Sequence, residues 1–222
     1  MSILPALSNQ LDEIGQILGV LREMERRQRD NRRSFYEKSR MIAASKAAIY
    51  IMFYNTIEAA MRALLLELRS KMQLEEVLFY QATEFWRLDA IQARFLHRMT
   101  SGTNHGNLLG ELVPMTSAAI SWSQEDLDRL PFSGNFGQSA ALKLSSDLGL
   151  DWKPPKGTLG GNDLENIRER RNALAHGLET FYEAGSQVTA SGLSDSLSRV
   201  RTFMSSYVAA IETYSHQRGY IT

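Results

Sequence analysis

The sequence predicts an all-α protein, an up-and-down helical bundle with an irregular insertion between about residues 72 and 135. Apolar residues recur at spacings of three and four over long stretches, which is the helical period, and no run alternates as a half-buried strand would. With 222 residues, 43% of them hydrophobic and 23% charged, the chain can bury a sizeable core. We expect a single domain covering residues 1–222.

Composition limits the function classes. The chain has no cysteine, which excludes a disulfide scaffold, a cysteine nucleophile and a zinc finger. Basic and acidic residues number 25 each, which argues against coating nucleic acid through bulk charge but leaves a local basic cleft open. No apolar run approaches the ~20 residues of a membrane span, and no basic region precedes the apolar N-terminal residues as in a secretory signal. The expected location is the cytoplasm, with no membrane partner.

The first helix is expected over residues 7–29, with Leu11, Ile14, Leu18 and Leu21 on one face. It runs into an arginine-rich stretch, REMERRQRDNRR. This stretch is either a solvated helix end with internal ion pairs or a patch that contacts phosphates.

The longest periodic segment runs from about Glu37 to Met72, and its broad apolar face is typical of a central bundle helix. On it, Asn55, Glu58 and Arg62 follow one another at spacings of three and four, so their side chains can touch.

Between residues 72 and 162 the helical pattern is interrupted. Residues 75–99 look helical, but TSGTNHGNLLGELVPM is expected to be a loop because it holds three glycines and a proline. Short helices are expected to begin at Ser123 in SWSQEDLDRL and to cover QSAALKLSSDLGL, where Gly149 ends the helix. The stretch DWKPPKGTLGG reads as a linker.

Two helices complete the chain. The first has Asn162 or Asp163 as its expected N-cap. Its apolar row is Leu164, Ile167, Arg171, Leu174, Leu178 and Phe181, in which Arg171 is the charged exception. The last helix has an unbroken apolar seam formed by Leu193, Leu197, Val200, Met204, Tyr207, Ile211 and Tyr214. Such a seam predicts burial against other helices or against a second copy of the chain.

Arg171 raises the question of function, because an arginine on a core-facing row is costly unless it meets an anion. It either pairs with a carboxylate, such as that of Glu58, or lines a cleft that receives an anion. Asn172 and His176 are four residues apart and share a helix face. Arg171 and His176 are five apart, about 140° round the helix, so one helix cannot point both at one small ligand without help, whereas two copies that meet across a cleft could. The structural alternatives are an ion pair for Arg171 and a helix-end cap for His176.

The stretch RNALAHG resembles the signature of the HEPN superfamily (higher eukaryotes and prokaryotes nucleotide-binding), in which an arginine is followed by four to six residues, the first usually polar, and then a histidine. The stretches YNTIEAAMRALL, FSGNFGQSAALKLSSDLGL and YSHQRGYI strengthen the likeness. Together they are similar to a prokaryotic subfamily associated with defence and toxin-type loci, over roughly residues 5 to 220.

The resemblance implies a bundle that dimerises through its motif helices and acts as a metal-independent endoribonuclease without a cofactor. His176 would be the general acid or base, Arg171 would hold the scissile phosphate, and Asn172 would orient His176 or contact the phosphate. Glu58 and Asn55 would have supporting roles. The residues expected to bind RNA are Arg168, Arg170, Arg26, Arg29 and Arg33.

The resemblance also implies partners: RNA as substrate, a second copy of the chain, and an antitoxin or a second defence-system protein. HEPN toxins that are silenced by tyrosine modification often carry tyrosine two residues after the histidine, where this chain has Leu178. Two other function classes stay open. The chain could be a HEPN module that binds RNA, a nucleotide or a partner protein without cleaving, or a structural helical subunit of a larger complex.

Overall fold

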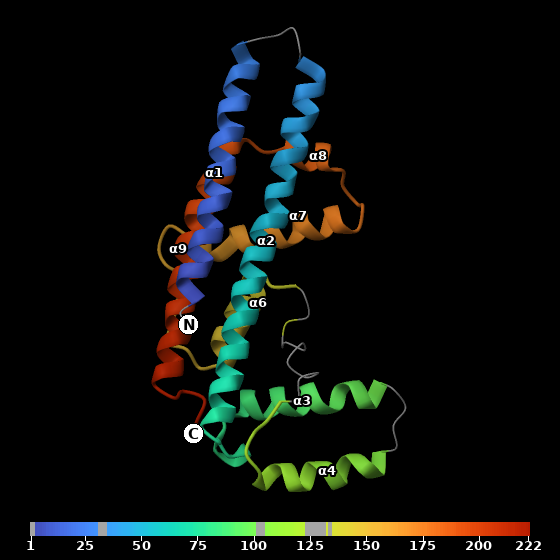
Figure 1. Ribbon diagram of the computed structural model, residues 1–222, viewed down its shortest axis with the longest axis vertical. Helices are drawn as coiled ribbons and strands as arrows, with labels where there is room; N and C mark the ends of the chain where they lie inside the picture. Colours follow the sequence, from blue (N-terminus) through green and yellow to red (C-terminus); the bar gives the residue numbers. More distant parts are fainter. Residues whose placement is uncertain (1–2, 31–34, 101–104, 123–131, 133–134) are drawn as a thin grey trace. The chain divides into compact units, whose positions relative to one another are not determined.

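The computed structural model describes residues 3–30, 35–100, 105–122, 132 and 135–222 (Figure 1). The described residues are mostly helical, with two isolated β-bridges and no strand, which confirms the all-α class. The longer helices are α1 (Ile3–Asp30), α2 (Phe35–Leu74), α3 (Glu84–Thr100), α4 (His105–Ser117), α6 (Gln138–Asp147), α7 (Asn162–Ala175), α8 (Phe181–Ser186) and α9 (Ala190–His216). Two short 3₁₀ helices, Phe79–Gln81 and Leu159–Gly161, lie between them. The helix expected to begin at Ser123 falls outside the described residues.

The described chain divides into two compact units. The first is formed by residues 1–60, 135–142 and 153–208, and the second by residues 61–134, 143–152 and 209–222. Helices α2, α6 and α9 each contribute a stretch to both units.

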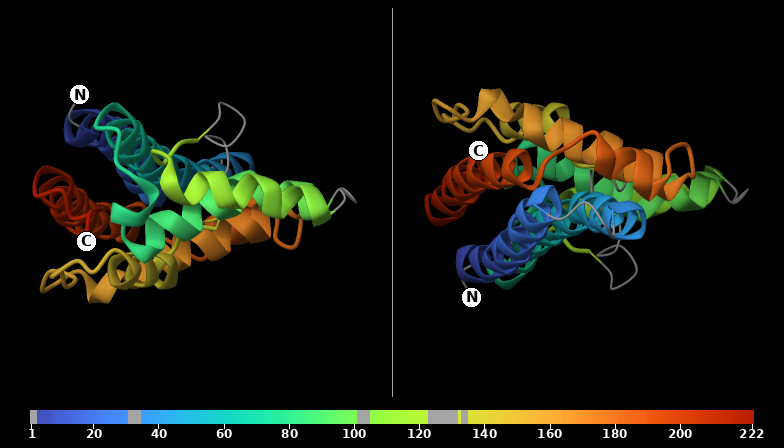
Figure 2. Two further views of the ribbon diagram at one scale, coloured as in Figure 1. Left: turned by 90° about the horizontal axis from the view of Figure 1, so that it is seen from below. Right: turned by 90° about the horizontal axis from the view of Figure 1, so that it is seen from above.

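In the first unit, α1 and the first part of α2 run antiparallel, α9 lies along α1, and α7 crosses α2 (Figures 1 and 2). The predicted α1 face is confirmed, because Leu11, Ile14, Leu18 and Leu21 are all buried. The predicted α9 seam is confirmed as well, since all seven of its members are buried. At Gly15 a side-chain carbon would lie 3.3 Å from Leu197 of α9, so the two helices pack closely there.

One carboxylate ties three helices of the first unit together. Glu25 of α1 accepts a hydrogen bond from Lys46 of α2 at its Oε1 atom (2.7 Å) and from the backbone amide of Ala190, the first residue of α9, at its Oε2 atom (3.1 Å). Lys46 also donates to the carbonyl of Val188 (2.6 Å). Because Lys46 is buried, this ion pair is shielded from solvent and fixes where α9 begins.

Helix α8 lies against α2 with almost no space between their backbones. Ala184 of α8 packs with Ala47 of α2 and Leu174 of α7 in one small apolar cluster. The next residue, Gly185, faces the backbone of Ala43, and a side-chain carbon there would overlap the Ala43 carbonyl. Glycine at 185 therefore permits this approach.

In the second unit, α3 and α4 run in opposite directions (Figure 1). The prediction that residues 100–115 form a loop is wrong, because α4 covers His105–Ser117. Its leucines favour helix and its Met115 is buried, and the helix continues through Pro114 to Ser117. The insertion is thus largely regular in its described part.

A buried ion pair organises the second unit. The Arg69 guanidinium donates two hydrogen bonds to Asp89, at 2.9 and 2.7 Å, and both side chains are almost fully buried. The Trp122 indole donates to the same carboxylate (3.1 Å), so its oxygens are well satisfied. Burial raises the pKa of Asp89, and the hydrogen bonds from Arg69 and Trp122 oppose that shift.

Residues Lys38–Leu74 of α2 are long and apolar enough to pass as a membrane span by length and composition alone. Half of the most apolar window in this stretch is buried inside the protein, and the core helix of a soluble protein passes the same test. The finding is therefore weak evidence for a membrane span.

Candidate functional site

The candidate site is built on α7, which enters from two glycines in the left-handed region. Gly160 and Gly161 have φ of 65° and 94°, and Gly161 is the N-cap. The predicted cap at Asn162 or Asp163 is wrong, since both lie inside the first turn. The Asp163 carboxylate instead accepts two hydrogen bonds from Arg199 of α9 (2.6 and 3.0 Å). This ion pair positions α7 against α9.

The C-terminal end of α7 explains the His-Gly sequence. Gly177 has φ of 67°, and its amide donates to the carbonyl of Leu174 while the amide of Leu178 donates to that of Ala173. This is the Schellman arrangement, which favours glycine and makes His176 the C-cap. The predicted apolar row is therefore wrong beyond Leu174: Leu178 is 81% exposed and Phe181, the first residue of α8, is 41% exposed.

Arg171 lies against an aromatic ring. Its guanidinium carbon is 4.4 Å from the centroid of the Tyr54 ring of α2, a cation–π contact, and its Nη1 donates to the Asn172 side-chain oxygen (3.0 Å). Within the described part of the chain, no carboxylate comes within 4.0 Å of this guanidinium, so the ion pair with Glu58, one of the two predicted alternatives, is not formed. Half-buried Arg171 is thus accommodated on the core-facing row by Tyr54.

The segment before α6 completes this cluster, which we call the Arg171 junction (Arg171, Asn172, Tyr54 and Asn135). The Asn172 amide donates to the Asn135 side-chain oxygen (3.0 Å), and the next amide, that of Phe136, donates to the Tyr54 hydroxyl (3.3 Å). Burial raises the pKa of Tyr54, and the nearby Glu58 carboxylate raises it further. The phenol therefore stays neutral at ordinary pH.

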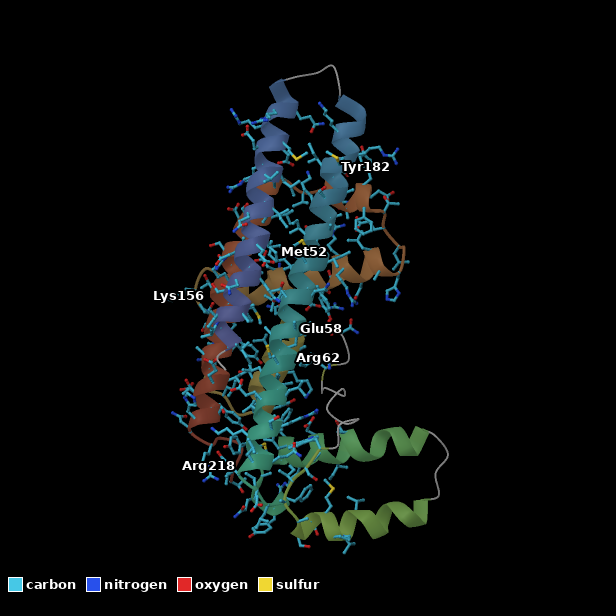
Figure 3. The ribbon with its side chains drawn as sticks, in the orientation of Figure 1. Met52, Glu58, Arg62, Lys156, Tyr182 and Arg218 are labelled. Carbon is cyan, nitrogen blue, oxygen red and sulfur yellow. The ribbon has the colours of Figure 1, made fainter. Side chains whose placement is uncertain are left out.

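The other predicted residues lie outside the Arg171 junction. His176 is exposed; its backbone amide donates to the Asn172 carbonyl (3.0 Å), and its ring forms no hydrogen bond or ion pair with the junction among the described side chains. Asn55 is exposed, whereas Glu58 is half-buried and projects from α2 near the level at which α7 crosses (Figure 3). One chain therefore brings Arg171 and Asn172 together and leaves His176 at the helix end.

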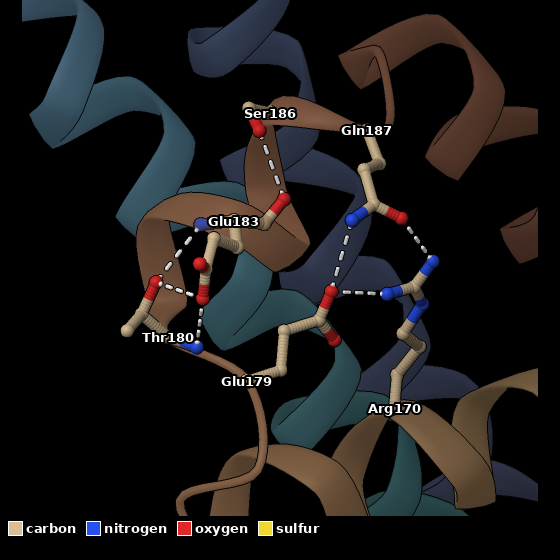
Figure 4. A network of polar contacts seen from close by, with 6 residues as sticks. All are labelled: Arg170, Glu179, Thr180, Glu183, Ser186 and Gln187. Carbon is tan, nitrogen blue, oxygen red and sulfur yellow. Dashed lines mark hydrogen bonds and ion pairs between the residues drawn. The ribbon is translucent and has the colours of Figure 1, made fainter.

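The arginines expected to bind RNA are mostly engaged by carboxylates. Arg168 pairs with Glu165 (2.6 Å), Arg170 pairs with Glu179 and donates to Gln187 (Figure 4), and Arg26 pairs with Glu23 (2.9 Å). Hydrogen bonds from Arg26 and Arg27 lower the pKa of Glu23 to about 2. The end of α1 thus carries internal ion pairs. Arg33 and the side chain of Arg29 lie outside the described residues.

A pocket opens on another side of α7. Its volume is about 460 Å³, and it is lined by Tyr50, Asn166, Glu169, Arg170, Ala173 and Glu179. We call it the Glu169 pocket. Neither this pocket nor the roles of Tyr54 and Asn135 are evident from the sequence, although Tyr54 and Asn135 stand in the stretches YNTIEA and FSGNFG that carry the family resemblance. The available signal for the pocket was the spacing of Asn166, Glu169 and Ala173 by three and four.

The described residues contain no group of three or more histidine, aspartate or glutamate side chains placed to hold a metal ion. Comparison with protein-family models, with curated proteins and with solved structures found no significant match to this chain.

Proposed function

We propose that this chain is a metal-independent endoribonuclease of the HEPN type, an up-and-down bundle that pairs with a second copy through α7 and acts in the cytoplasm in phage defence or growth arrest. The resemblance of RNALAHG and the three accompanying stretches supports the family. The half-buried guanidinium of Arg171 supports the ribonuclease activity.

The observation that carries the proposal is the guanidinium of Arg171, half-buried and without a carboxylate partner among the described residues. The neighbouring arginines of α7, Arg168 and Arg170, are neutralised by Glu165 and Glu179. Arg171 is therefore the cation on this helix that is available to an external anion. A planar guanidinium held on a ring face binds phosphate oxygens in a fixed orientation, which suits a phosphodiester.

The chemistry follows from the residue types. His176 takes the proton from a ribose 2′-hydroxyl, whose oxygen attacks the adjacent phosphorus; a new bond from 2′-oxygen to phosphorus forms as the bond to the 5′-oxygen breaks. The leaving 5′-oxygen takes up a proton from water, so the products are a 2′,3′-cyclic phosphate and a 5′-hydroxyl. Arg171 offsets the charge on the phosphorane oxygens, and Asn172 keeps the guanidinium in place through its 3.0 Å hydrogen bond.

A second copy of the chain would bring together Arg171 and His176, which lie apart within one chain. Arg171 lies against Tyr54, whereas His176 is exposed at the end of α7. In a pair of copies, His176 of one copy would face Arg171 of the other. Asn55 and Glu58 keep supporting roles, Glu58 through its electrostatic effect on Tyr54.

The alternative is a helical module that binds RNA, a nucleotide or a partner protein without cleaving. One observation favours it: His176 and Gly177 form a helix end that a structural protein would also use.

Cleavage of total RNA by purified protein in EDTA separates the two functions. Wild type should leave cyclic-phosphate ends, and His176→Ala and Arg171→Ala should each lower the rate at least about 100-fold. His216→Ala is the matched control, because His216 is likewise an exposed histidine at a helix end. Equal cutting by wild type and His176→Ala, or no cutting by any folded protein, would reject the ribonuclease in favour of the binding module.

A further inference from the structure

The Glu169 pocket has the volume of a small-molecule site and a mostly polar lining. A volume of about 460 Å³ falls in the range of small-molecule sites. Its walls combine one aromatic ring, Tyr50 of α2, with polar side chains of α7 and with Glu179 from the α7–α8 connection. All of these residues belong to the first unit, so the pocket is complete within it.

Charge decides what kind of ligand fits. Arg170 is neutralised by Glu179, and Gln187 donates to the same carboxylate (3.1 Å), so this wall is tied by hydrogen bonds and its ion pair carries little net charge (Figure 4). The Glu169 carboxylate is 3.6 Å from the guanidinium of Arg168, which already binds Glu165 at 2.6 Å, and the Glu169 side chain is 62% exposed. The pocket therefore offers a hydrogen-bonding carboxylate. Since Arg170 and Glu179 neutralise each other, Glu169 leaves one net negative charge in the lining, which disfavours an anion.

A neutral ligand with two adjacent donors suits this carboxylate. Among the four RNA bases, guanine alone presents two parallel N–H donors on its Watson–Crick edge, N1–H and N2–H. The amide of Asn166 lies one turn before Glu169 on the same face and has no hydrogen-bond partner among the described residues, so it can donate to the guanine O6. Tyr50 supplies a ring on which the base can stack, the usual mode for unpaired RNA bases.

The pocket is placed to act with the proposed active site. Glu169 and His176 are seven residues apart, two helical turns, so they lie on the same side of α7 and about 10 Å apart along its axis. A base held in the pocket would belong to a nucleotide close to the phosphate at His176.

We propose that the Glu169 pocket is a guanine subsite that selects an unpaired guanosine next to the cleaved bond. Its link to cleavage rests on the proposed function, whereas binding of the base does not. Tyr50 stacks on the base, Glu169 accepts from N1–H and N2–H, and Asn166 donates to O6.

Equilibrium binding of guanosine, inosine, adenosine and spermidine by calorimetry tests this subsite directly. Guanosine should bind best, and inosine, which lacks the N2 amine, should bind roughly 10- to 100-fold more weakly because one hydrogen bond to a charged group is lost. Glu169→Gln and Tyr50→Ala should each weaken guanosine binding about 10-fold or more, whereas Tyr50→Phe should not. Glu84→Gln, the same change at an exposed glutamate of the second unit, is the control.

Spermidine binding in place of guanosine, or guanosine binding unchanged in Glu169→Gln, would overturn the subsite. Mapping of cut positions in RNA keeps the two proposals apart. Cutting without a guanosine preference, together with no guanosine binding, rejects the subsite and leaves the ribonuclease. Guanosine binding without cutting rejects the ribonuclease and leaves the pocket as a base-binding site.

Discussion

The contact between Gly185 and the α2 backbone makes a sharp stability test. A side-chain carbon at Gly185 would overlap the Ala43 carbonyl and lie 2.9 Å from the Ala43 Cα, closer than such carbons come to other atoms in proteins. The obstacle is backbone, so no side-chain rotation can relieve it. Overpacking of this kind costs about 1–3 kcal/mol, and we expect Gly185→Ala to fall near the upper value.

Gly19→Ala is the matched control, because Gly19 lies inside α1 with nothing within 4 Å of a new side-chain carbon. There alanine should add roughly 0.5–1 kcal/mol of stability by helix propensity. For a chain of this length a change of 1 kcal/mol shifts the Tm by about 2–4 °C. Gly185→Ala should therefore lower the Tm by about 6–12 °C, while Gly19→Ala raises it slightly.

Thermal unfolding followed by circular dichroism measures both variants, and hydrogen exchange at the α8 amides reports whether α8 leaves α2 locally instead. A Gly185→Ala protein with unchanged Tm and unchanged protection of α8 would refute the close packing of these helices.

Three further outcomes are expected. Asp89→Ala should cost about 3–5 kcal/mol in urea unfolding, because it leaves a buried guanidinium without its carboxylate. Tyr54→Leu should slow RNA cleavage roughly 2- to 30-fold in initial-rate assays by removing the ring under Arg171, whereas Tyr54→Phe should retain activity. The pKa of Glu75 is held below its usual 4.5 by a hydrogen bond from Tyr220, so its carboxylate stabilises the fold above pH 4.5, and this stabilisation is lost as the pH falls through the lower, folded-state value. The Tm difference between wild type and Glu75→Gln should therefore shrink as the pH falls below 4.5.

Each outcome has its contradiction. Asp147→Ala removes an exposed ion pair with Lys143 and should change the free energy of unfolding by less than about 1 kcal/mol. If Asp89→Ala costs no more than Asp147→Ala, the ion pair between Arg69 and Asp89 is not buried as described. Full activity in a folded Tyr54→Leu protein would mean that the ring does not position Arg171. A Tm difference at Glu75 that grows towards acid pH would reverse the sign of its contribution.

The sequence predicted the helices whose apolar period runs unbroken. The α1 face and the α9 seam are buried as expected, because a row at spacings of three and four fixes both the helix and its buried side. The apolar row of α7 ends at Leu174 because Gly177 adopts a left-handed conformation. Local hydrogen bonds decide where this helix ends, and the spacing of apolar residues does not predict them. Helix α4 was not predicted, because the glycines and the proline in its sequence are typical of a loop, although its leucines favour helix.

The candidate site was predictable only in part. The sequence indicates that Arg171 needs compensation, by a carboxylate such as that of Glu58 or by an anion in a cleft, but it does not indicate the contact with the Tyr54 ring, four residues earlier on α2. Spacing along one helix cannot choose between two residues on the same face of another, since that choice depends on how α7 crosses α2. The bond from Asn172 to Asn135 joins residues 37 apart and has no local signal at all.

The two oxygens of Glu25 have a consequence for the order in which the chain is assembled during synthesis. Lys46, which binds one oxygen, follows Glu25 by 21 residues, whereas the amide of Ala190, which binds the other, follows it by 165. Because a ribosome releases the chain from its N-terminus, the pair between Glu25 and Lys46 can close an α1–α2 hairpin while the second oxygen still faces water. The arrival of α9 then replaces that water with an amide, so the last long helix docks onto a hairpin already built to receive it.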